Sequence, residues 1–319
     1  MIIRCLTSSF LALSFTGSCF AQYATEFRGH SDKVHSVAVS PDGKTLATAG
    51  FDSTVKLWEI ASGKNTLTLG GPTGHSGPVY CVAFHPQGKM LASSGLDKTI
   101  KIWSLPDGKL LQDIKQGLTD IIDQIAFSPD GKQLASGSAD KSVRLWNPAD
   151  GKEMKNLGAH GGSVYAVAFN FDGKFLASGG ADNTVKIWDV AGLKEAKSIK
   201  AQEMAITGLV FTPDGKSVLS VGLDKFLRVL DINSGTETKK IGPTEDDLYG
   251  IAWSRDGKTL ATIGYAGYIH TWDLDSGKST FQLKLKSPAY CITFMADGKA
   301  VVTGLDNQLA VVTPLTAAK

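Results

Sequence analysis

Apolar and polar residues alternate in short runs between residues 158 and 190, with the period of a β-strand. Three strands are predicted in this stretch, at 163–169, 175–178 and 184–190. The turn between the first two contains Gly173, which tolerates positive φ at no steric cost. The third strand is rich in β-branched residues, which favour a pleated surface. Short strands punctuated by frequent turns are typical of an all-β protein.

The same pattern returns seven times along the chain. The turn before the second strand keeps its glycine at residues 43, 88, 131, 173, 215, 257 and 298, in steps of 41 to 45 residues. An aspartate before the third strand recurs independently, with Ala266 in its place in the sixth copy. Two unrelated landmarks with one spacing establish an internal repeat. The aspartates assigned to this position are Asp52, Asp97, Asp140, Asp182, Asp224 and Asp306.

The third strand ends in a similar way in most copies. A tryptophan closes it in five copies, and Gly-His or Ala-His opens three copies, at His30, His75 and His160. These residues resemble the WD-repeat family, in the form of a secreted bacterial protein. The resemblance covers about residues 23–315. It implies a β-propeller whose units are four-stranded antiparallel blades. The tryptophans are Trp58, Trp103, Trp146, Trp188 and Trp272.

Physical reasoning also favours a closed ring. A single blade exposes two apolar faces and must stack on neighbours, and a circle leaves no terminal face uncovered. Each copy supplies its fourth, outermost strand after the tryptophan, as residues 65–69 do in the first. The last copy ends before such a strand. We therefore predict a seven-bladed propeller in which residues 23–28 pair with 308–315 and complete the last blade.

The first 21 residues differ from the rest of the chain. Arg4 supplies a positive charge, residues 5–15 are largely apolar, and small residues lead to Ala21. This order is typical of a secretory signal peptide cleaved after Ala21. It predicts a mature propeller over residues 22–319, located in the periplasm or secreted. An apolar N-terminal strand is the alternative, and a lipid anchor at Cys19 is less favoured because the preceding residues are not aliphatic.

Composition and charge limit the partners and cofactors that the sequence predicts. The formal net charge is +2 without a long basic run, so no nucleic-acid partner is predicted. No membrane span is predicted after the signal segment. Cys81 and Cys291 fall in equivalent places of different copies, and we expect them to lie far apart and unbridged. The histidines are spread singly, so no metal site or cofactor is predicted.

Three copies combine His, Ser or Thr, Asp and Trp, which imitates a hydrolase triad. The family resemblance implies instead a structural hydrogen-bond network, since buried polar groups must satisfy one another. The set recurs in several copies and no nucleophile-elbow motif occurs, so we predict no catalysis. Blades without the histidine are expected to be less rigid. The sets are His30, Thr48, Asp52 and Trp58; His75, Ser93, Asp97 and Trp103; and His160, Ser178, Asp182 and Trp188.

The architecture of the propeller does not explain one repeated position in the innermost strands. The second residue of the innermost strand is tyrosine in four of the seven copies, although the whole chain has only 7 tyrosines. In a propeller this position lies near the mouth of the central channel, and Tyr265 should lie beside Tyr249. Tyrosine suits recognition because it offers a rigid surface with a polar tip. The alternative is a plug of mutually packed rings. The positions are His35, Tyr80, Asp123, Tyr165, Thr207, Tyr249 and Tyr290.

These observations predict a non-catalytic scaffold that binds a protein or peptide at the channel mouth. Two other readings stay open. One is a propeller enzyme of hydrolase or lyase type with its site at the same mouth, for which the sequence offers no paired carboxylates. The other is a structural subunit of an envelope complex. The identity of the partner does not follow from the fold, because one fold hosts many functions.

Overall fold

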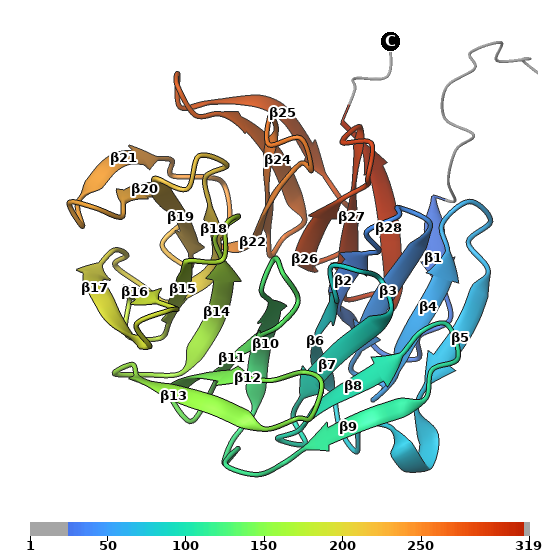
Figure 1. The fold of residues 1–319 in the computed structure, drawn as a ribbon. Coiled ribbons are helices and arrows are strands. Elements are labelled where there is room, and N and C mark those ends of the chain that lie inside the picture. Colours follow the sequence, from blue (N-terminus) through green and yellow to red (C-terminus); the bar gives the residue numbers. More distant parts are fainter. Residues whose placement is uncertain (1–24, 316–319) are drawn as a thin grey trace, which may run out of the picture.

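The computed structural model describes residues 25–315, and the signal peptide predicted at residues 1–21 lies outside that range. Within it the chain forms seven four-stranded antiparallel sheets arranged as blades around a central channel (Figure 1). A short 3₁₀ turn, η1 (Gly71–Thr73), stands between the first two blades. The predicted seven-bladed propeller is confirmed.

Four strands make up each blade, and blade seven takes its fourth strand from the beginning of the described chain. The innermost strands are β2 (Val34–Val39), β6 (Val79–Phe84), β10 (Ile122–Phe127), β14 (Val164–Phe169), β18 (Ile206–Phe211), β22 (Leu248–Trp253) and β26 (Ala289–Phe294). The second strands are β3 (Thr45–Gly50), β7 (Met90–Gly95), β11 (Leu134–Ser138), β15 (Phe175–Gly180), β19 (Ser217–Gly222), β23 (Leu260–Gly264) and β27 (Ala300–Leu305). The third strands are β4 (Val55–Glu59), β8 (Ile100–Ser104), β12 (Ser142–Trp146), β16 (Thr184–Asp189), β20 (Leu227–Asp231), β24 (Tyr268–Asp273) and β28 (Leu309–Pro314). The outermost strands are β5 (Asn65–Leu69), β9 (Leu110–Ile114), β13 (Glu153–Ala159), β17 (Lys194–Lys200), β21 (Glu237–Ile241), β25 (Lys278–Lys284) and β1 (Glu26–Arg28).

Strand β1 closes the ring as the sequence predicts. It lies antiparallel to β28, with Phe27 opposite Ala310, and the two strands stand side by side in Figure 1. The N–H of Val312 also donates to the carbonyl of Thr25 at 2.9 Å. Phe27 is 1% exposed and packs edge-to-face on Trp58, with ring centroids 5.9 Å apart. The described chain is therefore fastened both by backbone hydrogen bonds and by a buried aromatic contact with the neighbouring blade.

The core lies between the blades rather than inside any one of them. Between blades one and two, for example, Val55 and Leu57 of one sheet pack with Val79 and Leu91 of the next, and Trp103 completes the cluster. Comparable clusters join the other blades around the ring. Because every sheet buries both of its faces, no blade is expected to be stable alone.

One predicted equivalence is wrong. In the turn before the third strand, the residue that follows the aspartate has positive φ, as Lys98 does after Asp97 (φ 62°). In blade seven that residue is Gln308 (φ 73°), so the aspartate position belongs to Asn307. Asp306 therefore lies one residue earlier in the turn, at the level of the channel mouth.

Candidate functional site

A β-bulge occurs at the second residue of every innermost strand. In blade one the pairing with β3 jumps from Val34 to Ser36, which leaves His35 outside the ladder. The same interruption occurs in the other six blades. A bulge bends the strand and re-aims the extra side chain. The seven bulged residues are His35, Tyr80, Asp123, Tyr165, Thr207, Tyr249 and Tyr290.

All seven bulged residues line one cavity of about 460 Å³ in the central channel. The structure therefore brings together every residue that the sequence places at this position, although they come from seven different blades. Six are half-buried, and Tyr165 is 37% exposed. We call the surface around this opening the channel-mouth face. It is formed by the loops that enter the innermost strands and leave the second strands.

Six aromatic rings form a continuous arc around one side of the mouth. Tyr249 contacts Tyr265 and Tyr290, with ring centroids 5.3 and 6.3 Å apart. Tyr290 stacks on His35 at 5.4 Å, and His35 contacts Tyr80 at 4.9 Å. Tyr265 thus lies beside Tyr249, where the sequence places it. The aromatic arc consists of Tyr265, Tyr249, Tyr290, His35, Phe51 and Tyr80.

Phe51 is a member of the arc that sequence reasoning missed. It follows β3 directly and corresponds to Tyr265, which follows β23. Its ring stacks on His35 at 5.3 Å. The ammonium of Lys33 lies over Phe51 at 4.1 Å and over Tyr290 at 4.8 Å, a cation–π arrangement. Comparison of the residues that follow the second strands would have identified Phe51.

Hydrogen bonds hold part of the arc in place. The Nδ1–H of His35 donates to the carbonyl of Tyr80 at 2.9 Å, and burial lowers the pKa of His35 to about 4. The hydroxyl of Tyr290 donates to Asp306 at 2.7 Å, and burial together with that carboxylate raises the pKa of Tyr290. Both rings are therefore uncharged at neutral pH. The orientation of His35 is set by a strand of the next blade and that of Tyr290 by the turn after β27.

The other side of the mouth is more polar. The hydroxyl of Thr207 donates to the carbonyl of Leu248 at 2.6 Å, which ties blade five to blade six. Asp123 lines the cavity between Tyr80 and Tyr165 in the order of the blades. Burial and the nearby negative charge of Asp120 raise the pKa of Asp123 to about 7. The mouth thus has an aromatic side and a side with one half-buried carboxyl group.

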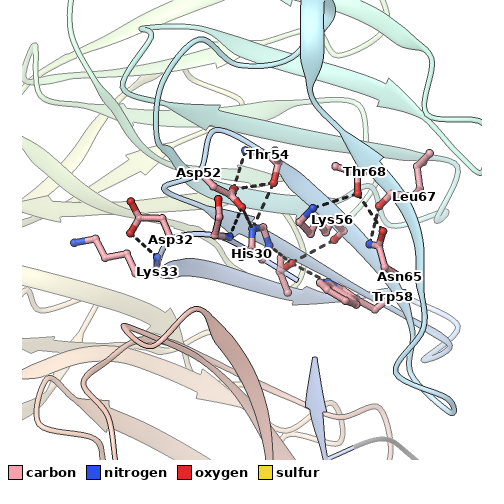
Figure 2. A network of polar contacts seen from close by, with 12 residues as sticks. His30, Asp32, Lys33, Asp52, Thr54, Lys56, Trp58, Asn65, Leu67 and Thr68 are labelled. Atoms are coloured by element: carbon pink, nitrogen blue, oxygen red, sulfur yellow. Dashed lines mark hydrogen bonds and ion pairs between the residues drawn. The ribbon is translucent and has the colours of Figure 1, made fainter. Parts of the chain in front are cut away.

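The polar set of blade one forms a chain of hydrogen bonds (Figure 2). The indole N–H of Trp58 donates to the hydroxyl of Thr48 at 2.8 Å, and that hydroxyl lies 2.7 Å from Nε2 of His30. The Nδ1–H of His30 donates to Asp52, with a shortest distance of 2.9 Å. Asp52 also accepts the backbone N–H of Ser31 at 3.0 Å. These hydrogen bonds join the loop before β2 to strands β3 and β4.

Blades two and four repeat this chain. In blade two the hydroxyl of Ser93 lies 2.8 Å from His75 and accepts the indole N–H of Trp103 at 2.9 Å. Burial disfavours the charge on Asp97, but the bonds from His75 and from a backbone N–H lower its pKa to about 2. Ser93 has no exposed surface, so its hydroxyl is inaccessible to a substrate. Blade four places His160, Ser178, Asp182 and Trp188 in the same way.

Blades three, five and six use other pairs at this level. In blade three Arg144 lies 3.4 Å from Asp140, and in blade five Arg228 lies 2.6 Å from Asp224. In blade six Nε2 of His270 lies 3.1 Å from Glu245. Arg144, Arg228 and His270 occupy the same position in the third strand, two residues before the tryptophan or its replacement. Sequence reasoning missed these pairs, and that shared position was the available signal.

The two cysteines of the described chain lie on innermost strands and are not bridged. Cys81 and Cys291 are free and line the channel. They lie on β6 and β26, which flank blade one, so they are closer than the sequence suggested. Burial raises the pKa of Cys291 to about 12. Between residues 25 and 315, no cluster of three or more His, Cys, Asp and Glu is placed to hold a metal ion. No helix in that range has the length and apolar character of a membrane span.

Comparison with known families agrees with this architecture. A model described as the first β-propeller of IFT122 matches residues 121–314, and a WD domain, G-beta repeat, matches residues 21–59 and 63–104. The fold and the repeats define a propeller of the WD class. The chain belongs to the WD40-repeat β-propeller family. Members of this family typically act as non-catalytic scaffolds for protein interaction.

Individual relatives match over about one repeat only. The ribosome biogenesis protein erb1 of Aspergillus clavatus is 56% identical over 41 residues, 13% of this chain and 5% of that protein. ERB1 of Chaetomium thermophilum is 52% identical over 40 residues, 12% of this chain and 5% of that protein. The BOP1 homolog of Drosophila virilis is 49% identical over 43 residues, 14% of this chain and 6% of that protein. The matched segment spans about one twentieth of these relatives.

Proposed function

We propose that this propeller is a non-catalytic scaffold that docks a peptide or protein loop on its channel-mouth face. The observation that carries the proposal is the aromatic arc, whose six rings gather from blades six, seven, one and two. Aromatic rings with polar tips are enriched at the energetic centres of protein interfaces. Lys33, which lies over two of these rings, adds a cation at the rim.

The alternative, a plug of packed tyrosines, predicts rings that fill the channel. The arc runs along one side of the mouth, and a cavity of about 460 Å³ remains beside it. Tyr265 and Tyr165 keep 42% and 37% of their surface exposed. Rings that served only to fill space would be expected to bury these surfaces against one another. The open cavity and the exposed tyrosines support docking over plugging.

The test replaces two tyrosines of the mouth. A pull-down with crosslinking from the native host compares the wild-type chain with Tyr165→Ala plus Tyr249→Ala. We expect the double variant to fold and to lose its captured partners, because truncating two rigid aromatic groups removes contact area at the centre of the surface. Phe171→Ala is the matched control, since Phe171 is 58% exposed and lies in the turn between β14 and β15, at the opposite end of blade four. A folded double variant that keeps every partner would refute the docking surface.

Export of the propeller from the cytoplasm is the second part of the proposal. Its support is the order of charged, apolar and small residues in the first 21 positions of the sequence. The expected N-terminus of the mature protein is Gln22. N-terminal sequencing of the protein recovered from fractionated cells measures this directly. A cytoplasmic protein that retains residues 1–21 would contradict the export proposal.

A further inference from the structure

Asp123 occupies an unusual environment in the channel. It is the bulged residue of β10, half-buried, and lines the cavity of about 460 Å³. Its Oδ2 atom is buried and has no hydrogen-bond partner among the described residues. A buried carboxylate oxygen without a donor costs free energy, so protein structures normally provide a partner. This side chain therefore lacks a partner that its chemistry requires.

Between residues 25 and 315, the chain supplies no cation to this carboxyl group. Burial and the negative charge of Asp120 raise the pKa of Asp123 to about 7, and within residues 25–315 no basic side chain counteracts them. Lys33 lies over Phe51 and Tyr290 in the aromatic arc, and the ammonium of Lys98 donates to the carbonyl of Thr119 rather than to Asp123. The unmatched charge at this side of the cavity is therefore negative.

Aromatic surface flanks the carboxyl group. Burial and the charge on Asp123 raise the pKa of Tyr80, which places the phenol within electrostatic reach of the carboxylate. Tyr165, the bulged residue of the next blade, is 37% exposed and makes no ring–ring contact within the described chain. A carboxylate beside open aromatic faces is the combination that recognises alkylammonium and guanidinium groups, by ion pairing and by cation–π attraction.

We propose that the cavity receives a lysine or arginine side chain from the docked peptide, with Asp123 as its carboxylate partner and Tyr80 and Tyr165 beside it. The inference rests on the proposed function and adds the chemistry of the partner. The occupant is a peptide side chain rather than a free cation, because the aromatic arc next to the cavity offers contact area for the flanking residues. A cavity of about 460 Å³ lies within the usual range of roughly 300–1,000 Å³ for ligand pockets.

The proposal implies a pH dependence of binding. Asp123 attracts a cation only when it is ionised, so binding should strengthen as the pH rises from 6 to 8. The titratable groups of the innermost strands on either side of β10 are Tyr80, Cys81 and Tyr165. His35 lies one blade further along, and Lys98, in the turn after β7, donates to the carbonyl of Thr119 in the loop before β10 at 2.9 Å. Burial raises the pKa of Tyr80 and of the Cys81 thiol and lowers that of His35, so all three are uncharged in this interval. Asp120, in the loop before β10, contributes the negative charge that helps to raise the pKa of Asp123.

The experiment uses the full chain and three probes. The first is a hexapeptide of glycine and serine around one arginine, the second has the neutral isostere citrulline in its place, and the third is butylguanidine, a free alkylguanidinium with a single charge. NMR titration at pH 8 should show the arginine peptide binding about tenfold more tightly than the citrulline peptide. Asp123→Asn, which keeps the shape and removes the charge, should abolish that difference. The arginine peptide should also bind more tightly than butylguanidine.

Three outcomes would overturn the proposal. They are equal binding of the arginine and citrulline peptides, retained preference in the folded Asp123→Asn protein, and binding of butylguanidine as tight as that of the arginine peptide. None of them affects the docking surface itself, which is judged by the variant of Tyr165 and Tyr249. If that double variant keeps its partners but the arginine preference depends on Asp123, the cavity binds basic groups and the wider docking surface is wrong.

Discussion

At the residue scale, the chemistry of the mouth depends on one backbone irregularity that every blade repeats. The bulge turns the second residue of the innermost strand out of the ladder, whatever its side chain. In blades six, seven, one and two the bulged residue is aromatic and its ring joins the aromatic arc, and where it is Asp123, a carboxyl group becomes partly buried without a cation. The same β-bulge therefore places side chains on both the aromatic and the polar side of the mouth.

The environment of Asp123 predicts a pH-dependent stability difference. Its pKa rises from 3.8 to about 7, so folding favours the protonated form. The wild-type protein should lose stability relative to Asp123→Asn as the pH increases from about 4 to about 7, and the loss should be complete above that interval. We expect the gap between the two proteins to widen by about 2–3 kcal/mol between pH 5 and pH 8, because each pH unit below the raised pKa contributes about 1.4 kcal/mol. Urea unfolding measures it, and parallel profiles would contradict the assigned environment.

The hydrogen-bond network predicts that replacing two different serines by alanine lowers the stability of the protein by different amounts. Ser93 serves both Trp103 and His75, whereas Ser136 of blade three accepts only the indole N–H of Trp146, at 2.9 Å. Ser93→Ala leaves two buried groups without a partner and should cost about 2–4 kcal/mol. Ser136→Ala is the matched control and should cost about half as much. Thermal unfolding of the two variants tests this, and equal costs would argue against a coupled network.

At the element scale, the blades stabilise the turn before the third strand by different pairs. Blades one, two and four use a histidine and blades three and five an arginine, whereas in blade six the N–H of Ala266 in this turn donates to Asp246 in the loop before β22. The expectation that blades without the first histidine are less rigid did not consider these pairs and stays a prediction.

Strand β1 is the element whose loss should matter most. A chain that starts at Gly29 lacks the pairing with β28 and the burial of Phe27 against Trp58. Removal of a buried phenylalanine alone costs about 3–5 kcal/mol, so the truncated chain should melt well below one that starts at Gln22. Phe27→Ala in the longer chain separates the side-chain part from the backbone part. Equal melting temperatures for the two chains would mean that β1 does not hold the ring closed.

At the scale of the whole molecule, the architecture was predictable because repeated landmarks fix blade number and strand order. The position of the bulged residues was predictable for the same reason. The prediction for Asp306 was wrong because the seventh copy lacks the aspartate that marks this turn. An alignment error of one residue there assigns a side chain of the channel mouth to the turn. Phe51 was missed because its ring partners come from other strands, whereas each arginine lies only four residues after its aspartate and could have been found from its repeated position in the third strand. Contacts between blades depend on how neighbouring blades pack, which the spacing of the repeats does not give.

The most direct test of the docking face is a site-specific photocrosslink. A benzophenone amino acid replaces Tyr165 at the mouth in one chain and Phe171 at the opposite end of blade four in another, both of which are exposed in the structure. After irradiation in the native host, the account predicts a defined protein or peptide adduct from position 165 and none from position 171. A folded protein that yields the same adducts from both positions, or an adduct from 171 alone, would contradict it.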